Sequence, residues 1–264
     1  MALWEVFALK YAEQDETTRK RGDNFLFDDH PDLGHGIDFF VWVLKSELGV
    51  ILVDTGYDEA EAKRRGKPIL RDPAEALSAL DIRAEDLTDV VITHLHFDHA
   101  GGLDRYPAAR FHLQEAEMAY ATGPCMCPGA LQRPFTVGHV IEMVKSVYSG
   151  RVIFHDGAGG IAPGVTVHKV GGHSRGLQAV RVETANGPLC LASDASHFYE
   201  NFQTGKLFPI VVDAADMIAG FDLIRRLAGD DSRVIPGHDP QTTQFYPVFG
   251  TSGFVWKLDA PRLG

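Results

Sequence analysis

The sequence of this 264-residue chain predicts an α/β fold in which β-sheets are covered by helices in layers. Short runs rich in Val and Ile, bounded by Gly, Pro or Asp, recur along the chain and are typical of strands. Stretches with helical patterns stand between some of these runs. Strand pairs occur in both halves of the chain, and the interspersed helices indicate layered packing.

The predicted elements follow one another along the whole chain. Strand-like runs occupy residues 4–9, 39–46, 49–56, 89–93, 151–156, 165–172, 177–184, 188–194 and 233–237. Helical patterns occupy residues 58–65, 74–80, 114–122, 137–149 and 214–228. Residues 13–38 are irregular, and residues 123–134 are dense in Gly and Pro, which predicts a loop. Because no internal repeat divides the chain, we expect one domain over residues 1–264.

Composition and charge restrict the kind of partner. The chain is 45% hydrophobic and 23% charged, which is ordinary for a globular protein with a sizeable core. Its net charge is −11, whereas a nucleic-acid binder usually needs a basic face. No segment approaches the ~20 apolar residues of a membrane span. We therefore expect a small-molecule substrate, no nucleic-acid or membrane partner, and a monomer or homodimer.

The start of the sequence and the cysteines predict the compartment. The first residues carry no cationic start, no apolar run of signal length and no small-residue cleavage site. The three cysteines, Cys125, Cys127 and Cys190, are an odd number and give no disulfide framework. We expect a reduced, cytoplasmic protein.

Three histidines and an aspartate fall within six consecutive residues of the stretch ITHLHFDHAGG, residues 92–102. The group begins where the apolar run DVVIT ends, so its side chains should lie at the rim of a sheet. In extended backbone His94 and His96 point to the same side, which brings two imidazoles onto one cation. Asp98 and His99 follow where the chain turns into AGG, and they can point at a second, neighbouring site. Gly101 permits the tight backbone of that turn.

Further ligands are expected downstream, because four neighbouring side chains cannot enclose two cations. His173, Asp194 and His238 each follow directly on an apolar strand-like run. All three are therefore expected on the same sheet rim as His94. Imidazoles combined with carboxylates suit zinc, although iron and manganese accept similar ligands.

The order His-x-His-x-Asp-His, then His, then Asp, then His resembles the metallo-β-lactamase superfamily, from LVDTG at 52–56 to PGHDP at 236–240. The resemblance implies an αββα four-layer sandwich with two zinc ions at one edge, or iron, manganese or cobalt in their place. It also implies the ligands: the first metal is held by His94, His96 and His173, the second by Asp98, His99 and His238, and Asp194 bridges both. Asp54 of LVDTG would accept the other N–H of a ligand imidazole.

Several branches of that superfamily fit this chain less well. The β-lactamases themselves typically carry Cys where this chain has Asp194, and flavin-linked di-iron oxidoreductases carry Glu where it has His96. The negative net charge of the chain disfavours the RNA-processing relatives, which would be expected to add RNA-binding elements. Glyoxalase II-like thioester hydrolases and persulfide dioxygenase-like enzymes stay as alternatives. A non-catalytic metal-binding protein is a further alternative, although a structural site is usually closed and mononuclear.

Within the superfamily the chain most resembles the N-acyl-homoserine lactonases and related lactone hydrolases. The phrases HLHFDHAGG, GGHSRG and SDASxxxENF carry this resemblance. Phe97 is the residue type that those enzymes place against the acyl chain. Such lactonases usually have Tyr three residues after the bridging Asp, whereas this chain has His197 there and Tyr199 two residues on.

The resemblance implies a dinuclear-metal hydrolase in which a metal-bound hydroxide opens a lactone ring, with quorum quenching as a plausible role. We expect catalytic roles for Asp98, Asp194, His197 and Tyr199, with His197 or Tyr199 donating to the developing oxyanion. Asp194 would carry a proton to the leaving oxygen. We expect the substrate to contact four aromatic residues: Phe97, Phe25, Phe27 and Phe198.

Two other motifs give weaker evidence of function. Residues 172–176 match the G-x-S-x-G nucleophile elbow, but a strand-like run follows where that motif needs a helix. Cys125 and Cys127 lack the spacing of zinc or redox pairs, so a role in lining the pocket is the alternative to incidental thiols.

Overall fold

Six strands between residues 5 and 155, joined by one strand from near the C-terminal end, build a seven-stranded sheet. The computed structural model describes residues 2–263. The order of strands in this sheet is β12-β1-β2-β3-β4-β5-β6. Their bounds are β1 Glu5–Gln14, β2 Ile37–Ser46, β3 Gly49–Val53, β4 Asp89–Val91, β5 Arg110–Gln114, β6 Val152–His155 and β12 Val255–Lys257. The strands from β12 to β3 pair antiparallel, and those from β3 to β6 pair parallel.

The second half builds a five-stranded sheet in the order β11-β10-β9-β8-β7. Their bounds are β7 Ala158–Ala162, β8 Val165–Lys169, β9 Gln178–Thr184, β10 Gly187–Ser193 and β11 Val234–Pro236. Only β10 and β11 pair parallel, so these two strands end at the same edge of the sheet.

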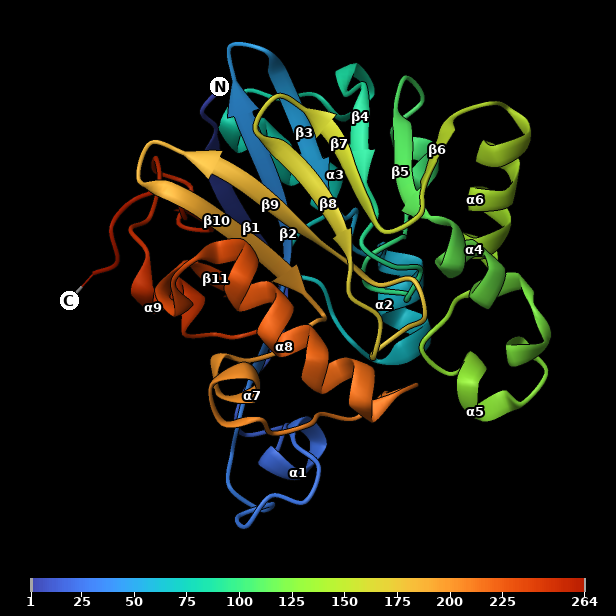
Figure 1. The fold of residues 1–264 in the computed structure, drawn as a ribbon, viewed down its shortest axis with the longest axis vertical. Helices are drawn as coiled ribbons and strands as arrows, with labels where there is room; N and C mark the ends of the chain where they lie inside the picture. Colours follow the sequence, from blue (N-terminus) through green and yellow to red (C-terminus); the bar gives the residue numbers. More distant parts are fainter. Residues whose placement is uncertain (1, 264) are drawn as a thin grey trace.

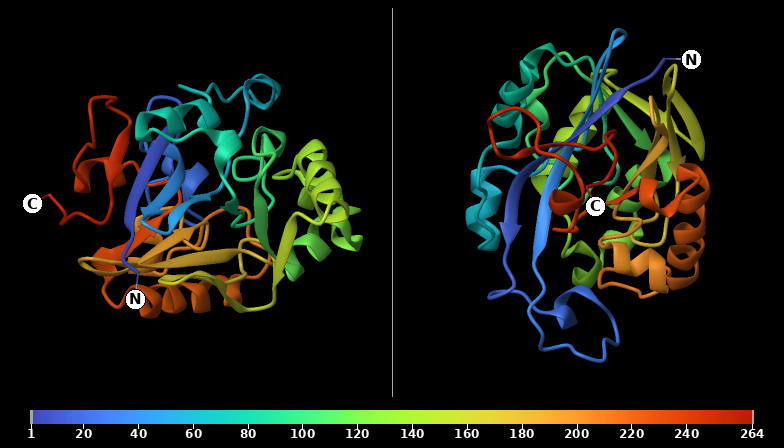
Figure 2. Two further views of the ribbon diagram at one scale, coloured as in Figure 1. Left: turned by 90° about the horizontal axis from the view of Figure 1, so that it is seen from above. Right: turned by 90° about the vertical axis from the view of Figure 1, so that its left-hand side faces the viewer.

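The two sheets stand face to face, and helices cover their outer faces (Figures 1 and 2). The helices are α1 Arg21–Asn24, α2 Glu59–Arg65, α3 Pro73–Ala76, α4 Glu115–Thr122, α5 Gly129–Gln132, α6 Val137–Tyr148, α7 Tyr199–Thr204, α8 Ala214–Ala228 and α9 Thr242–Phe245. One apolar core lies between the two sheets. A second lies between the seven-stranded sheet and its helices, and a third lies between the five-stranded sheet and its helices. The observed fold is the four-layer sandwich that the resemblance implied.

Alternation and composition explain why these segments take these roles. Residues 37–44 of β2 are all buried, because this strand is central in its sheet and is packed on both faces. Asp213 caps the start of α8, because its side chain accepts from the backbone N–H groups of Ala215 and Asp216, and Gly229 caps the end in a left-handed conformation. No helix among residues 2–263 is both long and apolar enough to span a bilayer.

The sequence patterns missed the weakest elements. β5 carries Arg, His and Gln, β7 contains two glycines, and β12 has three residues, so none shows an apolar run of strand length. Residues 13–38 are less irregular than expected, because β1 runs to Gln14 and α1 lies within the segment. Within the predicted loop 123–134, short helical turns at Pro124–Met126 and α5 occur.

Candidate metal centre

The metal-binding segment follows β4 and is anchored before its first histidine. Both the backbone N–H and the hydroxyl of Thr93 donate to the carboxylate of Asp54, at 2.7 and 2.8 Å. Asp54 lies directly after β3 in the left-handed region, with a φ of 60°, which aspartate tolerates better than most residues. Two neighbouring parallel strands therefore end in one hydrogen-bonded unit, and the chain that leaves it carries His94.

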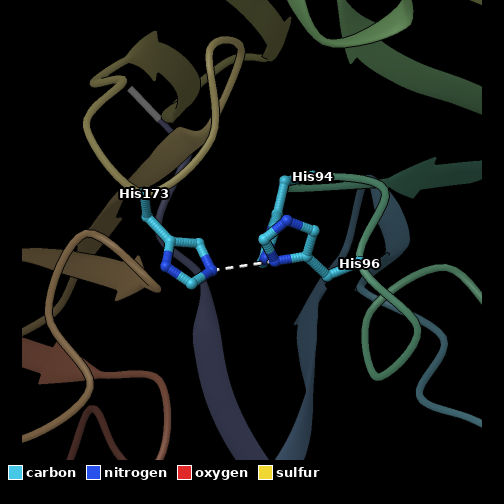
Figure 3. Close-up of side chains that lie close together, drawn as sticks. All are labelled: His94, His96 and His173. Atoms are coloured by element: carbon cyan, nitrogen blue, oxygen red, sulfur yellow. Dashed lines mark hydrogen bonds between the residues drawn. The ribbon is translucent and has the colours of Figure 1, made fainter. Parts of the chain in front are cut away.

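The first ligand cluster joins the two sheets. His94 and His96 come from the loop after β4, whereas His173 comes from the loop after β8 (Figure 3). All three rings are buried, and His173 Nε2 lies 2.9 Å from His96 Nδ1. Three imidazoles at this spacing match the three-histidine face of a zinc site.

The second cluster contains Asp98, His99 and His238, and Asp194 lies between the two clusters. Asp194 Oδ2 faces the first cluster, at 3.1 Å from His173 Nε2. Asp194 Oδ1 faces the second, at 3.1 Å from His238 Nε2 and 3.3 Å from His99 Nε2. Each oxygen of this carboxylate is therefore directed at a different cluster. The structure brings together all seven of the predicted ligands.

Unpartnered buried atoms show that these residues fit a metal. The Nε2 atoms of His94 and His99 and the Oδ1 atom of Asp194 are buried and have no hydrogen-bond partner among residues 2–263. Buried polar atoms are rarely left without a partner, since each costs free energy. Converging imidazole nitrogens and carboxylate oxygens are the donor set that divalent zinc prefers.

The electrostatics of the site favour the ligand-ready forms of His94, His96 and Asp194. At His99, by contrast, burial is outweighed by the charges of Asp194, Asp54 and Asp98, which raise the pKa well above its usual value. Burial holds the pKa of His94 and His96 well below the usual value, so both rings are neutral. Burial alone would raise the pKa of Asp194, but the surrounding imidazoles, His238 and His99 first among them, hold it well below its usual range. Asp194 is therefore a carboxylate, the form that can bridge two cations.

Ring orientation is set by acceptors behind the site. His99 Nδ1 donates to the carboxylate of Asp54 at 2.7 Å, which is the supporting contact that the resemblance implied. His238 Nδ1 donates to the backbone carbonyl of Asp38 at 2.8 Å. Each contact fixes the tautomer, so the opposite nitrogen, Nε2, is left as the ligand atom.

Glu117 is a supporting residue that the sequence patterns missed. Its buried carboxylate accepts from the backbone N–H of Leu95 at 2.9 Å and from Gly176 N–H at 2.9 Å. It also accepts from the Ser174 hydroxyl at 2.6 Å. Glu117 therefore ties the loop of His94 to the loop of His173. A single glutamate in α4 carries no spacing signal, so only the three-dimensional structure identifies it.

The clusters line a cavity of about 420 Å³. Its apolar lining consists of Ile37, Phe39, Phe97, Pro134, Pro209 and Ile210. A wider hollow of about 1090 Å³ lies beside it over α2 and α6, and the two share Arg65 and Arg133. The smaller cavity is the candidate reaction site, because five of the seven predicted ligands line it: His96, Asp98, His173, Asp194 and His238.

Of the two residues considered for the lactonase tyrosine position, the structure puts His197 on the cavity wall. His197 Nε2 lies 2.9 Å from Asp194 Oδ2, and its ring stacks on Phe208 with centroids 3.9 Å apart. Tyr199 is buried elsewhere, with its hydroxyl 3.5 Å from the Thr242 hydroxyl, and does not line this cavity. Burial lowers the pKa of His197 to about 3, so its ring is neutral.

Of the four predicted substrate contacts, Phe97 alone lines the cavity. Phe25 and Phe198 pack against each other, with centroids 5.3 Å apart, behind the wall that His197 forms. Phe27 is 96% exposed and points away from the core. An aromatic residue near a motif in sequence can therefore face the packed side of its segment rather than the site.

The two weaker motifs are not part of the metal site. The Ser174 hydroxyl donates to Glu117, and strand β9 follows it where a nucleophile elbow needs a helix. Cys125 and Cys127 are free thiols outside the clusters formed by the described residues, and Cys125 lines a separate hollow beside α4.

Sequence comparisons point to one family and to lactonases within it. The pattern of the Metallo-beta-lactamase superfamily matches residues 40–238. An N-acyl homoserine lactonase from Bacillus sp is 29% identical over 187 residues, covering 64% of this chain and 69% of the relative. The N-acyl homoserine lactonase AttM from Rhizobium radiobacter is 26% identical over 174 residues, covering 63% of each.

Solved structures agree in fold. An N-acyl homoserine lactone hydrolase with N-hexanoyl-L-homoserine bound at its metal centre superposes with a TM-score of 0.78 at 21% identity, over 94% of this chain and 98% of that one. AidC, a dizinc quorum-quenching lactonase, gives 0.69 at 16% identity, over 96% and 93%. The metal-dependent hydrolase class expected from the sequence is that of these relatives. With its family pattern, its four-layer fold and its paired ligand clusters, this chain belongs to the metallo-beta-lactamase superfamily.

Proposed function

We propose that this chain is a dinuclear-metal hydrolase that opens lactone rings, either N-acyl-homoserine lactones or related small lactones. The observation that carries the proposal is the pair of ligand clusters that share Asp194 on the wall of one cavity. The relatives named as N-acyl homoserine lactonases support a lactone as the substrate.

The proposed metals are two zinc ions. One would be held by His94, His96 and His173, the other by Asp98, His99 and His238, and both by Asp194. When bound, they would supply a nucleophile from water near neutral pH and would polarise the ester carbonyl. Asp54 and Glu117 keep the ligand loops in place, so the site is organised before substrate arrives.

His197 has a different role in this proposal from the oxyanion donor that the sequence suggested. Since a carboxylate can only accept, the proton on His197 Nε2 is donated to Asp194. The other ring nitrogen of the neutral imidazole, Nδ1, is then an acceptor. His197 thus orients the carboxylate of Asp194 and accepts a hydrogen bond from water or from a substrate hydroxyl, while Phe97 supplies an apolar wall.

A lactone panel tests the function. Zinc-loaded protein should hydrolyse short- and long-chain N-acyl-homoserine lactones or plain γ- and δ-lactones, measured with a pH indicator. A glutathione thioester serves as the comparison substrate, since glyoxalase II-like enzymes act on that class. Hydrolysis of the thioester with no lactone turned over would overturn the proposal.

The ligand assignment has its own prediction. Asp194→Ala removes the carboxylate that faces both clusters. The metal content per chain should therefore fall, and the rate of lactone turnover should fall by at least about 100-fold. The matched control is His30→Ala, because His30 is exposed and outside the clusters. Full activity of Asp194→Ala in a preparation without metal would contradict the assignment.

A further inference from the structure

Cationic side chains line the metal cavity in unusual number for a site that receives a neutral ester. Arg19, Arg65, Lys67 and Arg133 are all lining residues. Of the acidic lining residues, Asp98 and Asp194 belong to the metal clusters, which leaves Asp23. With two divalent cations bound, this cavity would carry a clear positive surplus in a chain whose net charge is −11.

Arg65 is not part of that surplus, because its charge is already compensated. It forms an ion pair with the buried Glu61 and donates to the backbone carbonyls of Arg133 and Phe135. Its guanidinium lies 3.9 Å from the centre of the Phe97 ring. Arg65 therefore holds the cavity wall together and has few donors left for a ligand.

Lys67 and Arg19 are different, because they donate to neutral acceptors and share one of them. Lys67 Nζ donates to Gln14 Oε1 at 2.7 Å, and Arg19 Nη1 donates to the same oxygen at 3.2 Å. Among residues 2–263, neither forms an ion pair with a carboxylate within 4.0 Å. The remaining Arg19 contacts are to the side chain of Asn24 and the backbone carbonyl of Asp23. The two cations are thus drawn together on the wall by one amide oxygen.

Such a pair is unfavourable without an anion. Burial and then the neighbouring charge of Arg19 lower the pKa of Lys67 to about 8. Burial also lowers the pKa of Arg19. An oxyanion placed between the two groups would replace repulsion by charge-assisted hydrogen bonds, which are the stronger kind. Arg133, exposed beside the same cavity, adds a third positive charge.

We propose that the substrate carries an anionic group, a carboxylate or a phosphate, next to its lactone ring, and that Lys67 and Arg19 bind this group. The inference rests on the proposed lactonase function and names a substrate class for the same site. A neutral lactone with a purely apolar tail would leave both cations uncompensated. The apolar residues of the wall would contact the carbon skeleton between ring and anion.

Matched substrate pairs test the inference. One pair is a γ-butyrolactone carboxylate and its carboxamide, which have nearly the same shape. The other is a sugar δ-lactone with and without a phosphate group. In at least one pair the charged member should have a kcat/KM about 10- to 100-fold higher than its neutral partner. The pair that shows the preference identifies the anion, and the preference should shrink as NaCl is raised.

Variants locate the effect. Lys67→Met and Arg19→Gln should each reduce the charged-to-neutral ratio of kcat/KM by about 10-fold, and using a ratio cancels any general damage to the site. Lys63→Met and Arg226→Gln are the controls, because both residues are exposed and outside the cavity. These controls should keep the wild-type ratio.

The outcomes separate this inference from the proposed function. If lactones are hydrolysed and both neutral members are turned over as fast as the charged ones, the anion site is wrong while the lactonase stands. If no lactone is hydrolysed, calorimetry tests the anion site separately. It measures the binding of the two charged ring-opened products to the zinc-loaded protein. Binding that weakens about 10-fold in Lys67→Met at unchanged metal content supports the anion site. Absence of binding, or equal binding by the variant, overturns it.

Discussion

At the scale of single residues, the site depends on buried atoms that have no hydrogen-bond partner among residues 2–263. The two oxygens of Asp194 face different clusters, and the Nε2 atoms of His94 and His99 are buried without a hydrogen bond. Lys67 and Arg19 likewise share one neutral acceptor, Gln14. Both arrangements cost stability in the ligand-free chain and are relieved by a ligand, a cation in one case and an anion in the other.

Lys67→Met should therefore stabilise the protein at neutral pH. The pKa of Lys67 is lowered from 10.5 to about 8 in the folded chain, so the charged form is penalised on folding. This penalty is complete below about pH 8, declines as the pH rises further and vanishes above 10.5. We expect a melting temperature higher by about 2–4 °C at pH 7, with a smaller gain at pH 9.5.

Thermal unfolding of variant and wild type at equal metal content measures this difference. Lys63→Met, an exposed position on α2, is the matched control and should show no such pH trend. A gain that grows between pH 7 and pH 9.5 would contradict the interpretation.

At the scale of elements, the site is a set of strand ends and the short loops that leave them. β3 and β4 deliver Asp54 and His94 side by side, and β10 and β11, which pair parallel, deliver Asp194 and His238. The close approach of those last two segments requires Gly237. A Cβ there would lie 2.6 Å from Asp194 Oδ1 and 2.9 Å from the Ser193 carbonyl.

Gly237→Ala should thus weaken metal binding more than it weakens the fold. The residue does not need a positive φ, so the backbone conformation accepts alanine, and the added methyl group acts through its contacts with Asp194 and with the Ser193 carbonyl next to it. A displaced ligand carboxylate should lower zinc affinity by about 10- to 100-fold. Competition with a fluorescent zinc chelator measures the affinity, and Gly129→Ala, where a Cβ meets open space, is the control.

At the scale of the whole molecule, the metal site joins the two sheets. The seven-stranded sheet supplies Asp54 and the loop from His94 to His99, whereas the five-stranded sheet supplies His173, Asp194 and His238. Away from this edge the sheets meet through an apolar core that includes Trp42. Because one core is continuous across both sheets, we propose that residues 1–264 unfold as one cooperative unit.

Metal removal tests this view. Ions that bind the folded chain and not the unfolded one add about 4 kcal/mol at a thousandfold excess over Kd. For a chain of this size we expect chelation to lower the melting temperature by about 10 °C, with recovery on adding zinc. Calorimetry should show one transition before and after chelation. Two separate transitions in the chelated protein would contradict a single cooperative unit.

From the sequence, local patterns predicted strands, helices and candidate ligands at strand ends, and the superfamily resemblance added the four-layer arrangement and the division of the ligands between two metals. An apolar run that ends in His or Asp indicates a strand end with a candidate ligand only, since the run 151–156 ends in His155 and Asp156 and neither joins a cluster of the described residues. The same logic misses β5 and β7, whose pairing partners rather than their composition make them strands. It also assigns aromatic contacts poorly, since Phe25 and Phe27 are two residues apart and yet the first side chain is buried and the second exposed.

Only the tertiary structure decided which distant residues support and line the site. Glu117 joins two ligand loops, and His197 rather than Tyr199 reaches the cavity. Lys67 meets Arg19 at Gln14, although Lys67 is far from the other two residues in sequence and shares no motif with them. Their charges matter because burial on one wall removes the water that would otherwise screen them, and burial is a property of the assembled fold.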